Sequence, residues 1–271
     1  MQTSHNYPDT GRLSIVSATT LLVYAVAPFI QLPPWDIAFQ LPGFFFDLQI
    51  QFTTLLSFLV AVLAAAGADW LIDSHPRLGN LTRASHWILP ALTAWSIGVP
   101  LTTIETGPQW WVVFALGGVL LVLVLLAEYI VVDPLDVRSG PASAGLTAVS
   151  FALFLVLAIT VHAAGLRLYL LLPVLAPAVF LVSLRTLYLE SRGTWYWGWG
   201  TGIALVVAEF AAGLHYWPLS SVQFGLILLA VSYGLTRLAG GILDGRSYRT
   251  VWVEPVIMTV VFTLLAIIFH A

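Results

Sequence analysis

Long apolar runs recur along the whole chain and leave it few ways to fold. They lie at residues 13–31, 50–72, 86–104, 110–132, 144–164, 168–189, 195–217, 219–239 and 252–270. A helix of about 20 apolar residues crosses the hydrocarbon core of a bilayer, and lipid offers no hydrogen-bond partners to exposed backbone groups. The runs are too long and too uniformly apolar for barrel strands. The sequence therefore predicts an all-α fold, a polytopic transmembrane helical bundle of about nine spans that forms a single domain over residues 1–271.

The composition agrees with a protein whose main partner is the lipid bilayer. Hydrophobic residues make up 59% of the chain and charged residues 8%, whereas soluble domains carry about 25% charged residues. The net charge is −3 and the arginines form no cluster, so nucleic acid is not expected as a partner. The chain has no cysteine, which excludes disulfides, thiolate metal sites and cysteine nucleophiles.

The arginines predict how the chain is threaded. With a cytoplasmic N-terminus, Arg167 alone would flank the outer ends of the spans. The cytoplasmic positions would be Arg12, Arg77, Arg83, Arg138, Arg185, Arg192, Arg237, Arg246 and Arg249. Such a bias follows the positive-inside rule and places the C-terminus outside. No cleavage pattern follows the first apolar run, so we expect an uncleaved first span in the bacterial cytoplasmic membrane.

Two aromatic stretches raise the question of a binding surface. The connection "QLPPWDIAFQLPGFFFDLQ" is rich in proline and aromatic residues and has no basic residue. We expect it to lie in the outer interface as a short amphipathic or re-entrant segment. The stretch "RGTWYWGWG", residues 192–200, opens the seventh span. Aromatic residues at such depths usually anchor helices at the lipid headgroups, which we favour over a stacking platform for a ligand.

One face of the seventh span carries small residues and a carboxylate. At about 100° per residue, this face holds Gly198, Gly202, Leu205, Glu209, Gly213 and Tyr216. Small residues let transmembrane helices approach closely, so we expect the face to pack against another helix, with Glu209 pointing into the bundle. A carboxylate inside a span suggests a proton relay or a site for a substrate or ion, with Tyr216 beside it. The alternative is a hydrogen bond between helices.

A second polar group lies toward the cytoplasmic ends of the even-numbered spans. It consists of Asp69, Glu128, Arg185 and Arg237. One hypothesis is that these residues form ion pairs between helices, for example Glu128 with Arg185. The alternative is that each side chain independently extends to the interface, as long charged side chains can.

Three histidines lie near the outer ends of the fifth, seventh and ninth spans. They are His162, His215 and His270. Neutral imidazole binds haem iron, zinc and copper, so these residues are candidate metal ligands. None is paired in an H-x-x-x-H spacing, and the alternative is three interfacial histidines. The sequence assigns no cofactor.

Several stretches of the chain resemble a known family. They are "GADWLIDSHPRL", "LRTLYLESRGTWYWGWG", "LHYWPLSSVQFGLILLAVSYGL" and "GRSYRTVWVEP". In these stretches the chain resembles a family of multi-pass membrane proteins from Chloroflexus-type bacteria to which no activity is assigned. The resemblance runs over most of the chain and implies a bacterial cytoplasmic membrane protein. It transfers no site residue.

Three functions remain open from the sequence. The chain has no H-E-x-x-H, no G-x-S-x-G and no P-loop, which favours a non-enzymatic component of a membrane complex, assembled with partner subunits or with further copies of itself. The first alternative is a small proton-coupled transporter that uses Glu209. The second is an intramembrane redox or metal protein built on the outer histidines.

Overall fold

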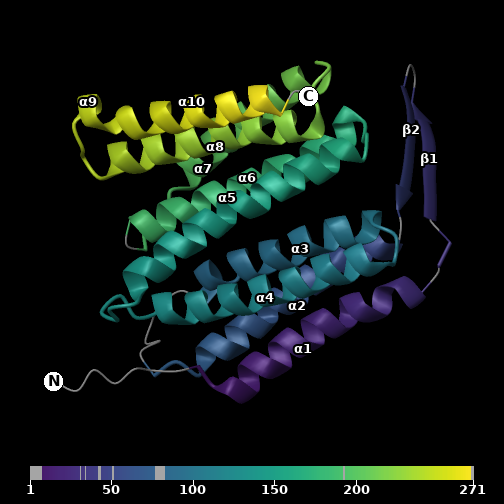
Figure 1. The fold of residues 1–271 in the computed structure, drawn as a ribbon, viewed down its shortest axis with the longest axis horizontal. Coiled ribbons are helices and arrows are strands. Elements are labelled where there is room, and N and C mark those ends of the chain that lie inside the picture. Colours follow the sequence, from purple (N-terminus) through teal and green to yellow (C-terminus); the bar gives the residue numbers. More distant parts are fainter. Residues whose placement is uncertain are drawn as a thin grey trace. The chain divides into compact units, whose positions relative to one another are not determined.

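Helices dominate the fold of the protein (Figure 1). The computed structural model describes residues 8–30, 32–33, 35–41, 44–50, 52–76, 83–191 and 193–269. In chain order the elements are α1 (Thr10–Val26), η1 (Ala27–Phe29), β1 (Trp35–Leu41), β2 (Phe44–Ile50), α2 (Phe52–Asp73), η2 (Arg83–His86), α3 (Ile88–Thr103), α4 (Pro108–Val131), α5 (Ser139–Ala163), α6 (Leu168–Glu190), α7 (Trp197–His215), α8 (Ser221–Leu243), α9 (Tyr248–Val251) and α10 (Val253–Ile268).

The predicted all-α transmembrane bundle is confirmed. Each predicted apolar run contains a helix, and within the residues that the structure describes eight helices are long and apolar enough to cross a membrane. The exception is α3, whose 16 residues span about 24 Å at about 1.5 Å per residue. More than half of the residues of α3 are buried, and it packs against both α2 and α4.

The helices form two compact units, Met1–Asp136 and Val137–Ala271. That they belong to a single domain stays a prediction. In the first unit α1 packs on α2 and α4, and α3 packs between α2 and α4. Its core is mainly aliphatic, with Val60, Ala64, Leu121 and Leu125, and it also contains Tyr24, Trp110 and Tyr129. Close helix approach depends on small residues such as Gly117, where an added Cβ would lie 2.7 Å from Ile97.

The second unit is organised around α8. This helix contacts α5, α6, α7 and α10, and α6 packs in addition on α5 and α7. Helix α8 begins with a capping box, in which the Ser220 side chain accepts from the Gln223 N–H and the Gln223 side chain accepts from the Ser220 N–H. A capping box satisfies two backbone donors that a helix start leaves unpaired. Helix α8 therefore has a defined start beside the end of α7.

The connection between α1 and α2 differs from the expected amphipathic or re-entrant segment. Strands β1 and β2 form an antiparallel pair (Figure 1). Polar and apolar residues alternate along much of both strands. The register sets Ile37 opposite Leu48 and Asp36 opposite Gln49, whereas Ala38 lies opposite Asp47. Such alternation has the period of a strand. The Pro-Gly pair between the strands in the sequence is a common turn signal, and the high aromatic content had obscured both patterns.

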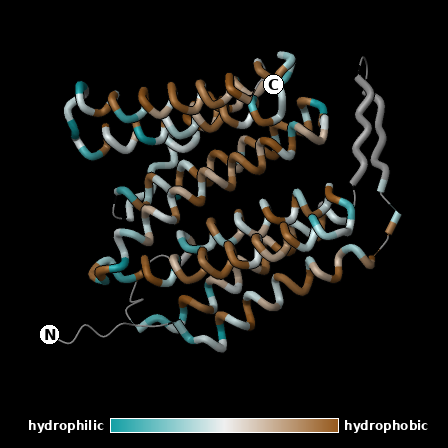
Figure 2. Tube along the Cα trace, in the orientation of Figure 1, coloured by the Kyte–Doolittle hydropathy of each residue, from teal (hydrophilic) through white to brown (hydrophobic). Residues whose placement is uncertain are grey.

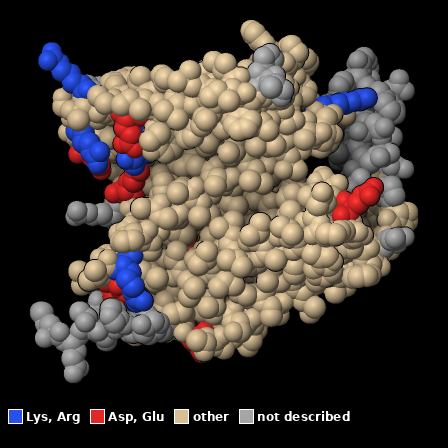
Figure 3. All heavy atoms as spheres, in the orientation of Figure 1, with Lys and Arg blue, Asp and Glu red and all other residues tan. Residues whose placement is uncertain are grey.

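The surface has the polarity that a bilayer requires. Figure 2 shows hydrophobic residues along the helices and hydrophilic residues mainly at their ends and connections. Only 17% of the α10 span is buried, and its outward face includes Val256, Ile257, Val260 and Leu264. In Figure 3 the charged side chains of the second unit gather mainly at one end of its helices. The apolar outward faces suit lipid contact.

Candidate functional site

Helix α7 packs into the second unit through a face of small and branched residues. Its buried residues are Gly200, Ile203, Ala204, Val207 and Ala211. The close approach to α6 centres on Gly200, where an added Cβ would lie 3.4 Å from the Phe180 ring and 3.6 Å from Leu184. Small residues allow such contacts between transmembrane helices, so this face holds α7 in the unit.

Within the second unit, no described residue packs closely on the glycines of the opposite face of α7. Nothing lies within 4 Å of a Cβ added at Gly198, Gly202 or Gly213. Leu205 is 61% exposed, and Glu209 is exposed as well. We name this surface, made of Gly198, Gly202, Leu205, Glu209 and Gly213, the open face of α7.

Within the second unit, no side chain fills the space beside these glycines, and Gly198 and Gly202 border the hollow between α7 and α8. That this face packs against another helix stays a prediction. Val207, at the centre of the packed face, is nine residues from Gly198, which at about 100° per residue is about 180° around the helix. Helical periodicity fixed which residues share a face and left open which face would be covered.

Glu209 lies within the apolar length of α7. Six residues separate it from the last residue of the helix, His215, which is about 9 Å at about 1.5 Å per residue. Its predicted neighbour Tyr216 is the C-cap residue and is 77% exposed. The structure thus places both on the same outward side of α7, with Glu209 inside the span and Tyr216 at its end.

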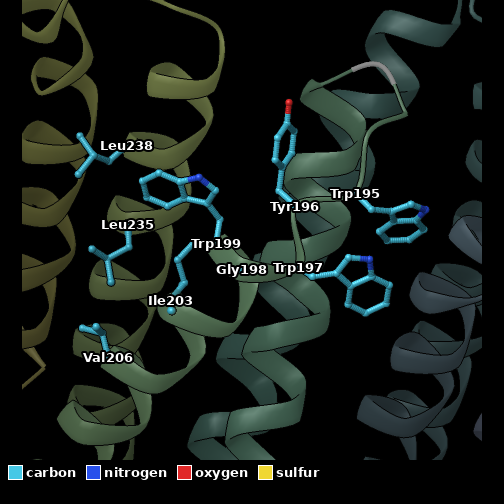
Figure 4. Close-up of a pocket in the computed structure, with 10 residues that line it drawn as sticks. Trp195, Tyr196, Trp197, Gly198, Trp199, Ile203, Val206, Leu235 and Leu238 are labelled. Carbon is cyan, nitrogen blue, oxygen red and sulfur yellow. The ribbon is translucent and has the colours of Figure 1, made fainter.

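The aromatic residues that precede and begin α7 point in different directions (Figure 4). Trp195 and Trp197 stack on each other with their ring centroids 5.6 Å apart, and Tyr188 of α6 lies 4.5 Å from Trp195. Trp199 lies on the other side of α7, toward Leu235 and Leu238 of α8. The three tryptophans and the two leucines line an open hollow of about 640 Å³. Its lining is almost entirely apolar, which suits lipid contact better than recognition of a polar ligand.

The richest polar cluster of the second unit surrounds Arg237 on α8. Its Nε and Nη2 donate to the two carboxylate oxygens of Glu254 on α10, at 2.9 Å and 3.0 Å. Its Nη1 donates to Glu190 at the end of α6. Tyr233, one turn earlier on α8, donates its hydroxyl to Glu254 at 2.9 Å. Bidentate arginine–carboxylate pairs are strong and directional, so the Arg237 cluster joins α6, α8 and α10.

A groove of about 620 Å³ opens from the Arg237 cluster. We name it the α5–α10 groove. Its lining residues are Ser143, Ala144, Thr147, Ala148, Phe151, Ala152, Leu155, Leu189, Glu190, Leu229, Tyr233, Arg237, Glu254, Met258 and Phe262. A concave, mostly apolar site with a few convergent polar groups is the usual form of a small-molecule site.

Sequence reasoning found Arg237 and missed its partners. Glu190 stands at the last position of α6 and Glu254 near the first position of α10. Both looked like ordinary charged residues at helix ends. The sequence does place Glu190, Arg237 and Glu254 near the same predicted membrane interface. It does not show that α6, α8 and α10 are neighbours, and this adjacency is what brings the three residues together.

In the first unit a buried histidine and carboxylate meet. His86 Nδ1 lies 2.7 Å from Glu128 Oε2, and their side chains are 6% and 0% exposed. His75 packs edge-on against Tyr129 with ring centroids 4.6 Å apart. Asp69 accepts a hydrogen bond of 3.0 Å from Trp87 Nε1. The polar side chains at this end of α2, α3 and α4 are therefore paired within the unit.

The predicted pair of Glu128 with Arg185 joins residues of different units and stays a prediction. Glu128 belongs to α4 of the first unit and Arg185 to α6 of the second. Both side chains are fully buried. Within its own unit, the Arg185 guanidinium carbon lies 5.5 Å from the centroid of the Tyr188 ring, a cation–π distance.

Two of the three predicted outer histidines lie near each other. His162 and His215 are close enough for their charges to interact. His162 Nδ1 is 3.1 Å from Ser221 Oγ, and its ring stacks on Phe224. His270 lies outside the described residues. Within the described ranges no group of three His, Cys, Asp or Glu side chains is placed to hold a metal ion.

Comparison with known proteins places the chain in a family. Residues 32–269 match the model of the family described as "Protein of unknown function (DUF5656)". The match covers most of the chain, so the protein belongs to this family, and the expected likeness to a family without an assigned activity is confirmed. No curated protein and no solved structure matches the chain.

Proposed function

We propose that this family member is a non-enzymatic component of the bacterial cytoplasmic membrane that assembles with further copies of itself through the open face of α7. The observation that carries the proposal is the exposed carboxylate of Glu209 among uncovered glycines. A charged carboxylate near the centre of a span costs about 2.5–3.5 kcal/mol when lipid surrounds it. A partner on this face would remove much of that cost.

The geometry favours a second copy as the partner. Two copies related by a twofold axis along the membrane normal would bring Glu209 to the same depth in both chains. Polar side chains that meet across two transmembrane helices can hydrogen-bond to each other, as Glu209 would with its counterpart. Gly198 and Gly202, four residues apart, would let the two helices cross closely. The open face is thus complementary to itself.

The two alternative functions have weaker support. A proton-coupled carrier needs Glu209 to face a water-filled path inside the protein, whereas it lies on a face that no helix of its unit covers. A redox or metal protein needs a set of ligands, and within the described residues no group of three His, Cys, Asp or Glu side chains is placed to hold a metal ion. The proposal keeps the predicted threading, with the N-terminus in the cytoplasm and the C-terminus outside, in agreement with the arginine bias.

Cysteine crosslinking tests the proposal without background because the natural chain has no cysteine. Leu205→Cys places a thiol on the open face. Leu116→Cys is the matched control, because Leu116 is 65% exposed on α4 and Leu205 is 61% exposed. On oxidation in native membranes we expect a disulfide-linked dimer from Leu205→Cys and little from Leu116→Cys. Equal crosslinking of the two variants, or a monomer throughout, would overturn the proposal.

A further inference from the structure

The α5–α10 groove changes from polar to apolar in the same direction along three helices. On α5 the lining runs from Ser143 and Thr147 to Phe151 and Leu155. On α8 it runs from Arg237 through Tyr233 to Leu229, and on α10 from Glu254 through Met258 to Phe262. Successive positions about four residues apart lie on one helical face. The groove therefore has a polar end at the helix termini and an apolar end within the span.

This gradient matches an amphiphile that lies parallel to the helices. A membrane lipid has its headgroup at the interface and its chain in the hydrocarbon core. The apolar end offers aromatic contacts, since Tyr233 packs edge-on against both Phe151 and Phe262, with ring centroids 5.1 Å and 6.1 Å apart. The volume of about 620 Å³ is within the range of sites that take a small molecule, and is suited to a headgroup and the upper part of a chain.

The polar end selects the charge of the headgroup. Glu190 and Glu254 carry two formal negative charges against one positive charge on Arg237. The guanidinium is already held by both carboxylates, so it is poorly placed to bind an anionic headgroup. Both oxygens of Glu254 accept hydrogen bonds. Glu190 Oε1 accepts from Arg237, and Glu190 Oε2 lies against Gly240 of α8. Each carboxylate oxygen has about two lone-pair sites, so the two carboxylates can accept further hydrogen bonds from a cationic ligand.

We propose that the α5–α10 groove binds a membrane lipid with a primary ammonium headgroup. The ammonium group has three donors, and it would donate to the Glu190 carboxylate and to the hydroxyls of Ser143 and Thr147, which line the same end. The lipid chain would lie along Phe151, Leu155 and the aromatic residues of α8 and α10. This site is separate from the open face of α7 and goes beyond the proposed self-assembly.

The first experiment fills the groove without touching the Arg237 cluster. Ala148 is an exposed groove residue, so Ala148→Phe would extend a ring into the groove and leave the core intact. Ala66→Phe is the matched control on α2, because Ala66 is also exposed but lies outside the groove. Each variant is reconstituted in nanodiscs of equal parts phosphatidylethanolamine and phosphatidylglycerol, released into the gas phase, and its retained lipids are counted by native mass spectrometry.

We expect the unaltered protein and Ala66→Phe to retain phosphatidylethanolamine in preference to phosphatidylglycerol, and Ala148→Phe to lose that retention. Glu190→Gln then separates headgroup recognition from simple lipid contact. It should lower phosphatidylethanolamine retention about tenfold or more, because it removes a charged hydrogen-bond acceptor from the polar end, and it should not lower phosphatidylglycerol retention. Glu105→Gln, a change at an exposed carboxylate outside the groove, should have no effect.

Two results would overturn the inference. Retention of both lipids in equal amounts by the unaltered protein would show that the groove does not select an ammonium group. Unchanged retention in Ala148→Phe would show that the lipid binds elsewhere. Neither result depends on whether Leu205→Cys crosslinks, so the lipid site and the self-assembly of α7 succeed or fail separately.

Discussion

The two faces of α7 are built from similar residues and have opposite environments. One face, with Gly200, Ala204 and Ala211, is buried against neighbouring helices of the second unit. The other, with Gly198, Gly202 and Gly213, has nothing within 4 Å of an added Cβ. A hydrophobic segment in lipid gains little from burying one apolar face over another. The choice between the faces therefore depends on the shape of the neighbouring helix.

The contact with α6 shows what decided the choice. The Phe180 ring and Leu184 of α6 fit against Gly200. These side chains fill the space that the missing side chain of Gly200 leaves on the packed face. The open face has Glu209 at its centre, and within one chain no described residue pairs with this carboxylate. Packing complementarity selects the first face for the interior of the unit and leaves the second for a partner.

The largest expected effect is on thermal stability, when the same substitution is made at a glycine on each face of α7. Gly200→Leu would force a side chain into Phe180 and Leu184, and overpacking of this kind costs about 1–3 kcal/mol. Gly202→Leu extends into open space and should leave the stability of the monomer unchanged. Thermal unfolding of both variants in the same detergent gives the comparison. If Gly202→Leu unfolds at as low a temperature as Gly200→Leu, the open face is covered within the chain.

The helices could be predicted from the sequence and their neighbours could not. Apolar runs of about 20 residues identify spans because a bilayer imposes their length, so each run contained a helix, even the short α3. The β1–β2 pair was missed because its alternation lies in a short connection rich in aromatic residues. Grouping into two units depends on contacts between helices, and the hydropathy of single runs contains no information about such contacts.

The candidate sites show the same limit at the level of single residues. Glu209 and the glycines were found because they interrupt an apolar run, and Arg237 because a charge near a span end is conspicuous. The partners of Arg237 come from α6 and α10, 47 positions before it and 17 positions after it. No sequence period links three helices, so the cluster and the groove beside it required the fold.

A smaller effect is expected from Glu209 itself. Glu209→Leu removes the hydrogen-bonding group from the open face, and Glu209→Gln keeps both a donor and an acceptor. Hydrogen bonds between transmembrane helices contribute about 1–2 kcal/mol in model peptides, so Glu209→Leu should weaken the dimer about tenfold and Glu209→Gln much less. Energy transfer between labelled copies at several protein-to-detergent ratios measures the association. Stronger association of Glu209→Leu would mean that the carboxylate opposes the contact.

The smallest expected effect on stability and association is at Tyr216, which follows the open face at the end of α7. This residue caps α7 and is 77% exposed, and its ring meets His215 edge-on at 5.1 Å. Tyrosine at such a position places its hydroxyl among the lipid headgroups. Tyr216→Phe keeps the ring and should change neither thermal stability nor association by more than about 0.5 kcal/mol. A loss of association as large as that of Glu209→Leu would extend the contact surface to the end of the helix, because the hydroxyl would then have to pair across the two copies.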